Sequence, residues 1–101
     1  EMCIRDSFRS MKYKVLLTSK FKKDFKLLKK QGKNTDKILA IINKLAKGEF
    51  LDAKYKDHPL LGDYLGAREC HIEPDLLLIY EKQENILILN ILRAGSHSNL
   101  F

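Results

Sequence analysis

Apolar residues recur with a helical period in the first half of the chain. Phe21, Phe25 and Leu28 follow one another at intervals of four and three residues, which places them on one face of a helix. Thr18 and Ser19 are suited to cap its start, and Gly32 to end it. The pattern therefore predicts an amphipathic helix between these limits, preceded by a strand over Lys12 to Leu17.

A second stretch repeats this spacing directly after a short loop. It is predicted to begin near Asn34 or Thr35 and to end at Gly48, with four apolar positions on one face: Ile38, Ile41, Ile42 and Leu45. Two amphipathic helices joined by a short loop favour an antiparallel hairpin with both apolar faces turned to a common core.

The second half of the chain has the patterns of strands and turns. Residues 49–65 are predicted to be irregular. Residues 67–73 alternate between polar and apolar side chains, as in a strand with one buried face. Residues 76–80 and 86–93 are apolar runs separated by turn residues, and the last run favours a central strand. The tail from Ala94 onward is predicted to be irregular.

These elements give the order β-α-α-β-β-β, which predicts an α+β fold. The helical hairpin packs on one face of a small, mainly antiparallel sheet. Nothing in the predicted order covers the opposite face of the sheet, so function is expected there. Residues 1–10 fit none of these patterns, and we expect a non-native or disordered leader followed by a single domain over 11–101.

Composition agrees with one small globular domain. The chain has 101 residues, 45% of them hydrophobic and 32% charged, which excludes a disordered tail. No stretch approaches the roughly 20 apolar residues of a membrane span, so no membrane association is expected. Two cysteines are too few for a disulfide scaffold and favour the cytoplasm. Cys70 lies on the apolar side of its strand and is expected to be an inert buried thiol.

Positive charge is concentrated in one segment. Of the net charge of +6, the segment Lys12 to Lys37 carries +8, from ten lysines and two acids, whereas residues 38–101 carry −2. A lysine-rich helix face is compatible with simple solvent exposure or with binding to phosphates, and charge alone does not decide between them.

All three histidines lie in the second half of the chain, together with an aspartate and an arginine: His58, His71, His97, Asp75 and Arg93. Histidine can give or take a proton near neutral pH, and arginine offers a planar fork to phosphate. Such a set suits cleavage of RNA by its own 2′-hydroxyl without a metal. Each residue, taken singly, also has a plain structural explanation.

Strand alternation gives a first placement of these residues. It puts Arg93 on the face of Leu89 and Ile91, and it puts His71 opposite Cys70. Whether Arg93 and His71 share a face depends on the strand register. The histidines are not at recognised zinc spacings, and no nucleotide-binding motif is present, so neither metal nor cofactor is expected.

The second half also resembles a known family. The resemblance to the YafQ branch of the RelE/ParE toxin superfamily runs from about Met11 to Phe101 and rests on four stretches: Asp57-His58-Pro59-Leu60, Gly66-x-Arg68-Glu69-Cys70-His71-Ile72-x-Pro74-Asp75, Leu78-Ile79-Tyr80 and Leu92-Arg93-x-Gly95-Ser96-His97-Ser98-x-Leu100-Phe101. It implies a type II toxin that cuts mRNA in the A site of the 70S ribosome without a metal.

The resemblance also implies roles for single residues. His58, His71, Asp75 and His97 fall on the acid–base set, with His97 expected as the acid and either His58 or His71, oriented by Asp75, as the base. Arg93 falls on the phosphate-stabilising arginine. Two further positions are expected to contact substrate: Phe101, and Leu76 where many members have tryptophan.

Partners follow from the same resemblance. A cognate antitoxin is expected, and operator DNA only through the toxin–antitoxin complex. The basic hairpin is then interpreted as the surface that docks on 16S rRNA, through Lys20, Lys22, Lys23, Lys26, Lys29 and Lys30. Two other functions remain open on the same fold: a ParE-like inhibitor of DNA gyrase, and a non-catalytic module that binds RNA or an antitoxin.

Overall fold

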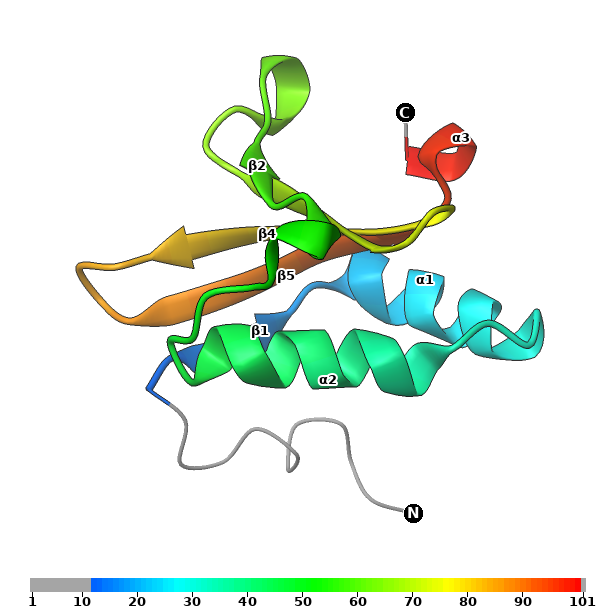
Figure 1. Ribbon diagram of the computed structural model, residues 1–101, viewed down its shortest axis with the longest axis horizontal. Helices are drawn as coiled ribbons and strands as arrows, with labels where there is room; N and C mark the ends of the chain where they lie inside the picture. The colour runs from blue at the N-terminus through cyan, green and yellow to red at the C-terminus, as the bar shows by residue number, and fades with distance from the viewer. Residues whose placement is uncertain (1–11, 101) are drawn as a thin grey trace.

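The computed structural model describes residues 12–100, which form a five-stranded sheet with two long helices on one face (Figure 1). The predicted leader over residues 1–10, Met11 and Phe101 lie outside the described residues. The strands are β1 (Lys14–Leu17), β2 (His58–Pro59), β3 (Arg68–Glu73), β4 (Leu76–Gln83) and β5 (Ile88–Gly95). The helices are α1 (Ser19–Lys30), α2 (Thr35–Ala46) and α3 (His97–Leu100), with 3₁₀ turns η2 (Ala53–Tyr55) and η3 (Gly62–Tyr64).

The sheet has the order β1-β5-β4-β3-β2. The last three long strands form the predicted antiparallel meander, and β1 runs parallel to β5, with Leu17 opposite Ile91. The central position predicted for the last strand is confirmed, because β5 lies between β1 and β4. The α+β class and the helical hairpin on one sheet face are confirmed as well (Figure 1).

Both long helices begin where their capping residues predict. The side chain of Thr18 accepts a hydrogen bond from the backbone N–H of Phe21, and the side chain of Asn34 accepts one from Lys37. The apolar positions predicted for the two helices are buried, and they pack against the sheet residues of the same layer, among them Leu78, Leu89 and Ile91.

The opposite face of the sheet is covered in part, which corrects the expectation of an open face. A second apolar cluster lies there, built on Leu77 and Ile79 of β4. Leu60 and Tyr64 reach it from the segment between β2 and β3, and Leu100 reaches it from α3. In Figure 1 this segment and α3 stand on the side of the sheet away from the helices, and they frame the sheet surface between them.

Three segments differ from the predicted elements. The apolar residues Ile86 and Leu87 precede β5, and Leu87 has a positive φ of 53°, which is a turn conformation. The strand starts later and runs on to Gly95. The segment predicted to be irregular contains β2, and the tail forms the short helix α3. For β2 and for the end of β5, pairing with a neighbouring strand decides the structure, and the local pattern does not contain that information.

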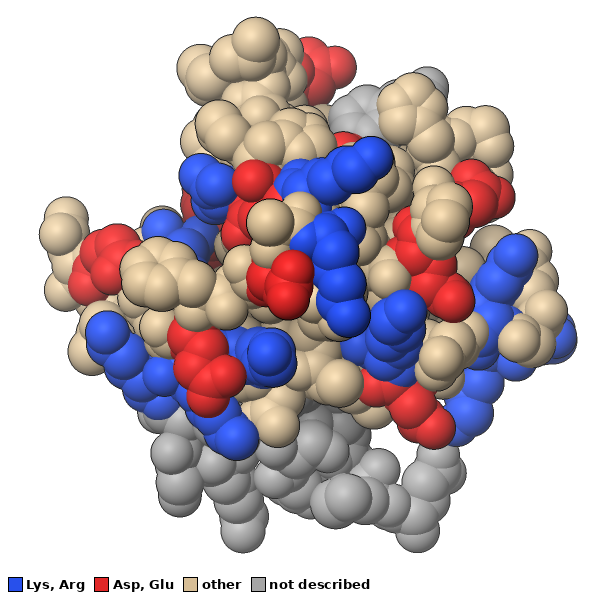
Figure 2. Space-filling model, in the orientation of Figure 1, with Lys and Arg blue, Asp and Glu red and all other residues tan. Residues whose placement is uncertain are grey.

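Charged side chains are unevenly spread over the surface. Figure 2 shows basic and acidic residues intermixed over the front of the molecule and basic side chains gathered at the end where α1 and α2 meet. The six lysines expected to bind rRNA are all exposed. Among the helices of residues 12–100, none is both long and apolar enough to cross a bilayer.

Candidate active site

The register of the sheet brings the key polar residues into one row. His58 of β2 lies opposite Glu69 of β3, Glu69 lies opposite Ile79 of β4, and Ile79 lies opposite Arg93 of β5. Since Ile79 belongs to the cluster on the face away from the helices, the whole row lies on that face. His71 lies two residues after Glu69 in β3, opposite Leu77, and so is on the same face. His58, His71 and Arg93 therefore share a sheet face.

A β-bulge puts Arg93 there. Tyr80 pairs with Ile91 and Ile79 pairs with Arg93, so that Leu92 is an extra residue in β5. Leu89 and Ile91 face the helices, whereas Leu92 packs in the opposite cluster. The prediction from strand alternation, which placed Arg93 with Leu89 and Ile91, is therefore wrong. A single inserted residue reverses the faces beyond it, and sequence periodicity does not reveal where it occurs.

A carboxylate bridges two histidines at one end of the row. Oε1 of Glu69 lies 3.3 Å from Nε2 of His58 and 3.3 Å from Nε2 of His71, and the two imidazole rings are 5.8 Å apart between centroids. The Glu69 side chain is 6% exposed, against 45% for His58 and 30% for His71. A buried carboxylate thus supports two imidazoles that solvent or a substrate can reach.

Glu69 was missed by the sequence analysis as a site residue. The only signal was its position two residues before His71 on the polar side of β3. Burial of that carboxylate depends on β2 pairing with β3, and β2 has only two residues, too few to leave a periodic signal.

Backbone contacts fix the orientation of His58. Its Nδ1 lies 2.6 Å from the carbonyl oxygen of Lys56, whose φ of 50° is left-handed. Because a carbonyl only accepts hydrogen bonds, Nδ1 carries the proton, and Nε2 holds the lone pair in the neutral ring. The neighbouring Asp57 is held by Arg68 at 2.8 Å and accepts a hydrogen bond from the Tyr80 hydroxyl. Nε2 of His58 therefore faces Glu69, and a proton taken up by Nε2 lies between the imidazole and this carboxylate.

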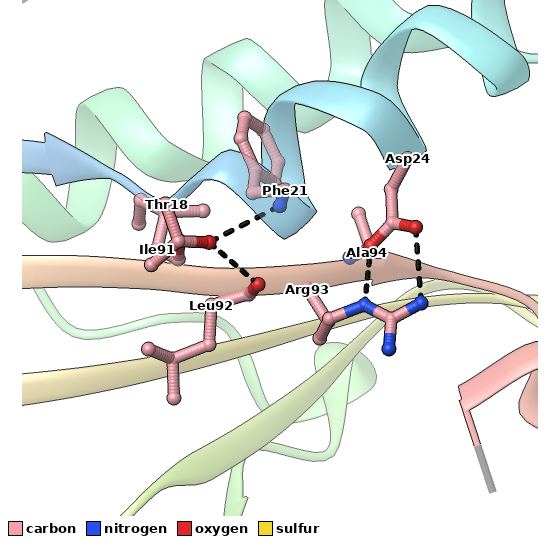
Figure 3. Close-up of polar contacts among 7 residues, drawn as sticks. All are labelled: Thr18, Phe21, Asp24, Ile91, Leu92, Arg93 and Ala94. Atoms are coloured by element: carbon pink, nitrogen blue, oxygen red, sulfur yellow. Dashed lines mark hydrogen bonds and ion pairs between the residues drawn. The ribbon is translucent and has the colours of Figure 1, made fainter.

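Arg93 is held at the other end of the row by a residue of α1. Nε of Arg93 donates to Oδ2 of Asp24 at 2.7 Å, and Nη2 donates to Oδ1 at 3.1 Å (Figure 3). This carboxylate raises the pKa of the Arg93 guanidinium, so the side chain stays charged. Arg93 and Glu69 are two strand positions apart, roughly 10 Å between backbones. That separation leaves room for a phosphodiester between them.

The remaining predicted site residues are placed differently. Asp75 lies in the turn between β3 and β4 and lines a pocket of about 370 Å³ with Leu28, Gln31, Lys33, Ser96 and Asn99. Among the described residues, the carboxylate in contact with His58 and His71 is that of Glu69, so the contacts do not support Asp75 as their orienting group. His97 is exposed at the start of α3.

Leu76 and Cys70 are core residues. Leu76 is 2% exposed and packs in the cluster between sheet and helices, which corrects the expectation that it contacts substrate. Its side chain packs on the helix face of the sheet, whereas the row of polar residues lies on the opposite face. Cys70 is fully buried as predicted, and burial raises its pKa to about 12.

A basic pocket of about 450 Å³ adjoins His71. Three lysines from separate segments line it, Lys37 of α2 and Lys54 and Lys56 around η2, together with Tyr55, Ile72, Glu73 and Pro74. These lysines belong to other elements than the predicted docking lysines of α1. A pocket with this charge next to an imidazole suits a second phosphate of a polyanion.

The two histidines and Glu69 also have the geometry of a metal-binding set. One ligand atom from each of His58, Glu69 and His71 lies within 4.8 Å of the others. Two imidazoles and a carboxylate suit Zn²⁺ or Cu²⁺. The sequence spacing gave no sign of this set, because it depends on the pairing of β2 with β3.

Comparison with known proteins agrees with this fold. Residues 13–101 match the family described as "Bacterial toxin of type II toxin-antitoxin system, YafQ". The mRNA interferase toxin YafQ of Escherichia coli K12 is 38% identical over 85 residues, which cover 83% of this chain and 90% of the relative.

Two solved structures extend the comparison. YafQ in the E. coli DinJ–YafQ toxin–antitoxin complex has a TM-score of 0.82 at 35% identity, covering 90% of this chain and 99% of that one. A metal-bound toxin from Helicobacter pylori has a TM-score of 0.79 at 42% identity, covering 86% and 97%. The chain belongs to the YafQ family of bacterial toxins of type II toxin–antitoxin systems.

Proposed function

We propose that this chain is a ribosome-dependent endoribonuclease that cleaves mRNA in the A site by metal-independent acid–base catalysis. The observation that carries the proposal is the contact of Glu69 with both imidazoles, on the sheet face that also holds Arg93. Relatives named mRNA interferase toxins support the same activity.

The proposed reaction uses the 2′-hydroxyl of the substrate as its nucleophile. His58 or His71 accepts the 2′-hydroxyl proton, and the resulting imidazolium is stabilised by Glu69. The 2′-oxygen then bonds to phosphorus, and the bond from phosphorus to the 5′-oxygen breaks as His97 supplies a proton to that oxygen. The products are a 2′,3′-cyclic phosphate and a 5′-hydroxyl. The orientation of His58, with Nε2 as acceptor, favours this residue as the base.

Arg93 stabilises the negative charge that develops on the phosphorane oxygens. Its guanidinium remains charged beside Asp24 and lies on the histidine side of the sheet. The basic pocket beside His71 is proposed to hold a neighbouring phosphate of the mRNA. Phe101 is proposed to orient a base of the mRNA. Asp75 is proposed to belong to the acid–base set, in which the contact with His58 and His71 is made by Glu69.

The partners are proposed on the same grounds. The exposed lysines of α1 dock on 16S rRNA. This binding is favoured because each lysine releases counterions from the RNA phosphates. A cognate antitoxin neutralises the toxin, as the DinJ–YafQ complex suggests by analogy, and the complex of the two binds operator DNA.

A ParE-like gyrase inhibitor and a non-catalytic binding module are the alternatives. Neither requires two imidazoles on one buried carboxylate, so the cluster favours the nuclease. The alternatives differ from it in an observable way: each would arrest growth or bind its partner without producing new mRNA ends.

The test is controlled expression followed by mapping of mRNA ends on translating ribosomes. We expect new ends with the wild type, and a loss on the order of 10²–10⁴-fold with His97→Ala and with Arg93→Ala. Ser98→Ala, on the same short helix as His97, is the control and should cleave like the wild type. Growth arrest without new mRNA ends would contradict the proposal.

A further inference from the structure

Asp24 is an unusual residue for its position in the chain. It is one of two acids in the segment Lys12 to Lys37, and it lies in the helix whose exposed lysines are proposed to bind RNA. A carboxylate on a surface that binds phosphates weakens binding. However, its side chain is only 15% exposed, and it points toward β5 (Figure 3). Its role is therefore to be sought at the sheet.

Among residues 12–100, no strand pairs with the end of β5 on the side of α1. The pairing of β1 with β5 ends at Leu17 and Ile91, so the β5 backbone beyond this point needs other partners. Thr18, the N-cap residue of α1, and Asp24 within the helix supply them. The Thr18 hydroxyl lies 3.0 Å from the carbonyl oxygen of Ile91 and 2.8 Å from that of Leu92, and Asp24 Oδ2 accepts from the N–H of Ala94 at 3.1 Å.

The same Asp24 carboxylate binds the side chain of Arg93. It thus holds the backbone and the guanidinium of the bulged segment together, with three hydrogen bonds to adjacent residues. Such a fork-to-fork contact fixes the plane of a guanidinium as well as its position. Arg93 directly follows the extra residue of the bulge. Because strand pairing is interrupted there, the backbone alone fixes the direction of the Arg93 side chain less firmly than in a regular strand.

Asp24 binds one edge of the Arg93 guanidinium, and this contact also fixes the direction of the opposite edge. Asp24 takes the edge formed by Nε and Nη2, so the edge formed by the two terminal nitrogens is directed away from α1. Tyr64, a residue of the cluster on the histidine side, contributes to raising the Arg93 pKa and so lies near this guanidinium. The second edge is the one suited to a phosphate.

We propose that Asp24 is a positioning residue that holds Arg93 in the orientation in which it stabilises the transition state. This inference rests on the proposed function. It adds a residue of α1 to a site otherwise built from the sheet and α3, and it distinguishes the two acids of the lysine-rich segment. Asp36, the other acid, is exposed in the first turn of α2.

The test is a double-mutant cycle of Asp24→Asn and Arg93→Ala, with Asp36→Asn as the control. We expect Asp24→Asn to lower kcat by about 10- to 100-fold with little change in KM, because the misplaced cation is needed only in the transition state. In the Arg93→Ala background the same change should have no further effect. Asp24→Glu should recover part of kcat, and Asp36→Asn should retain wild-type kcat.

A second readout follows the guanidinium itself. The NMR signal of the Arg93 Nε–H should shift strongly in Asp24→Asn and only slightly in Asp36→Asn, whether or not the protein cleaves RNA. If Asp24→Asn does not fold, as judged by its circular dichroism, Asp24→Glu takes its place and should lower kcat less than Arg93→Ala does.

Two results would overturn the assignment: full kcat in a folded Asp24 variant, or a loss that multiplies with that of Arg93→Ala. A wild-type protein that cleaves no mRNA would instead contradict the proposed function, and the NMR signal would still test the positioning of Arg93.

Discussion

Oε1 of Glu69 lies 3.3 Å from Nε2 of His58 and 3.3 Å from Nε2 of His71, so that a single buried oxygen serves two imidazoles on neighbouring strands. Since Glu69 is 5% exposed, its charge is little screened by water and acts mainly on these two rings. The account of catalysis above depends on this relationship.

Replacement of Glu69 by glutamine tests that dependence. Glu69→Gln keeps the shape of the side chain but removes the charge that stabilises an imidazolium, and we expect kcat to fall by about 10²-fold. The exposed Glu49 provides the matched control, and Glu49→Gln should not change kcat. Equal cleavage rates for Glu69→Gln and the wild type would remove the bridging carboxylate from the mechanism.

Metal removal distinguishes acid–base catalysis by His58 and His71 from metal binding by His58, Glu69 and His71. If the imidazoles act as acid and base, a chelator should leave the cleavage rate unchanged. Added Zn²⁺ should slow cleavage, because it would occupy the nitrogen lone pairs of His58 and His71. The inhibition should weaken in Glu69→Gln when measured relative to that variant's own rate. Loss of activity on chelation, restored by Zn²⁺, would show a metal-dependent enzyme instead.

The lysines of α1 are tested through the salt dependence of ribosome binding. Charge reversal of Lys22 and Lys26 should weaken ribosome binding. It should also reduce the slope of log Kd against log salt by the equivalent of about one phosphate contact per lysine. Lys44 and Lys47, which are exposed but belong to the α2 end of the hairpin, are the control pair. Equal slopes for both double variants would mean that α1 is not the docking surface.

Stability should depend on alkaline pH through Cys70. Its pKa is raised from 9.0 to about 12 by burial, so the unfolded chain loses this proton first. The contribution is complete below pH 9.0 and is lost as pH rises toward about 12, at up to about 1.4 kcal/mol per pH unit. Burial and the hydrogen bond to Asp57 also raise the pKa of Tyr80, which adds to the slope above its ordinary value of 10.0.

Urea unfolding of Cys70→Ala between about pH 8 and about pH 10 measures the part that belongs to the thiol. The variant is expected to be less stable at every pH, because the smaller side chain leaves a cavity, but its stability should fall less steeply. The same slope in the variant and the wild type would contradict the assignment.

Local patterns were sufficient for most of the fold. Phe21, Phe25 and Leu28 show a helical period, and Thr18 marks its start, so α1 could be predicted to within a residue. Ile86 and Leu87 misled the prediction because they are apolar but lie in a turn, where Leu87 adopts a positive φ. Strand ends depend on the pairing partner, which periodicity does not contain.

The site was predictable by residue type but not by geometry. His58, His71 and Arg93 were singled out as candidate site residues, but strand alternation placed Arg93 on the wrong face. Only the register and the bulge at Leu92 establish that the three share a sheet face. Glu69 and Asp24 were missed because their roles depend on contacts across the fold, to β2 in one case and to β5 in the other.

The most direct test of the central claim is the chemistry of the cut ends. Purified protein is added to ribosomes carrying a defined mRNA, and the end groups of both fragments are determined. Attack by the 2′-hydroxyl predicts a 2′,3′-cyclic phosphate on the upstream fragment and a 5′-hydroxyl on the downstream one. A 5′-phosphate on the downstream fragment would show that water is the nucleophile and would contradict the account.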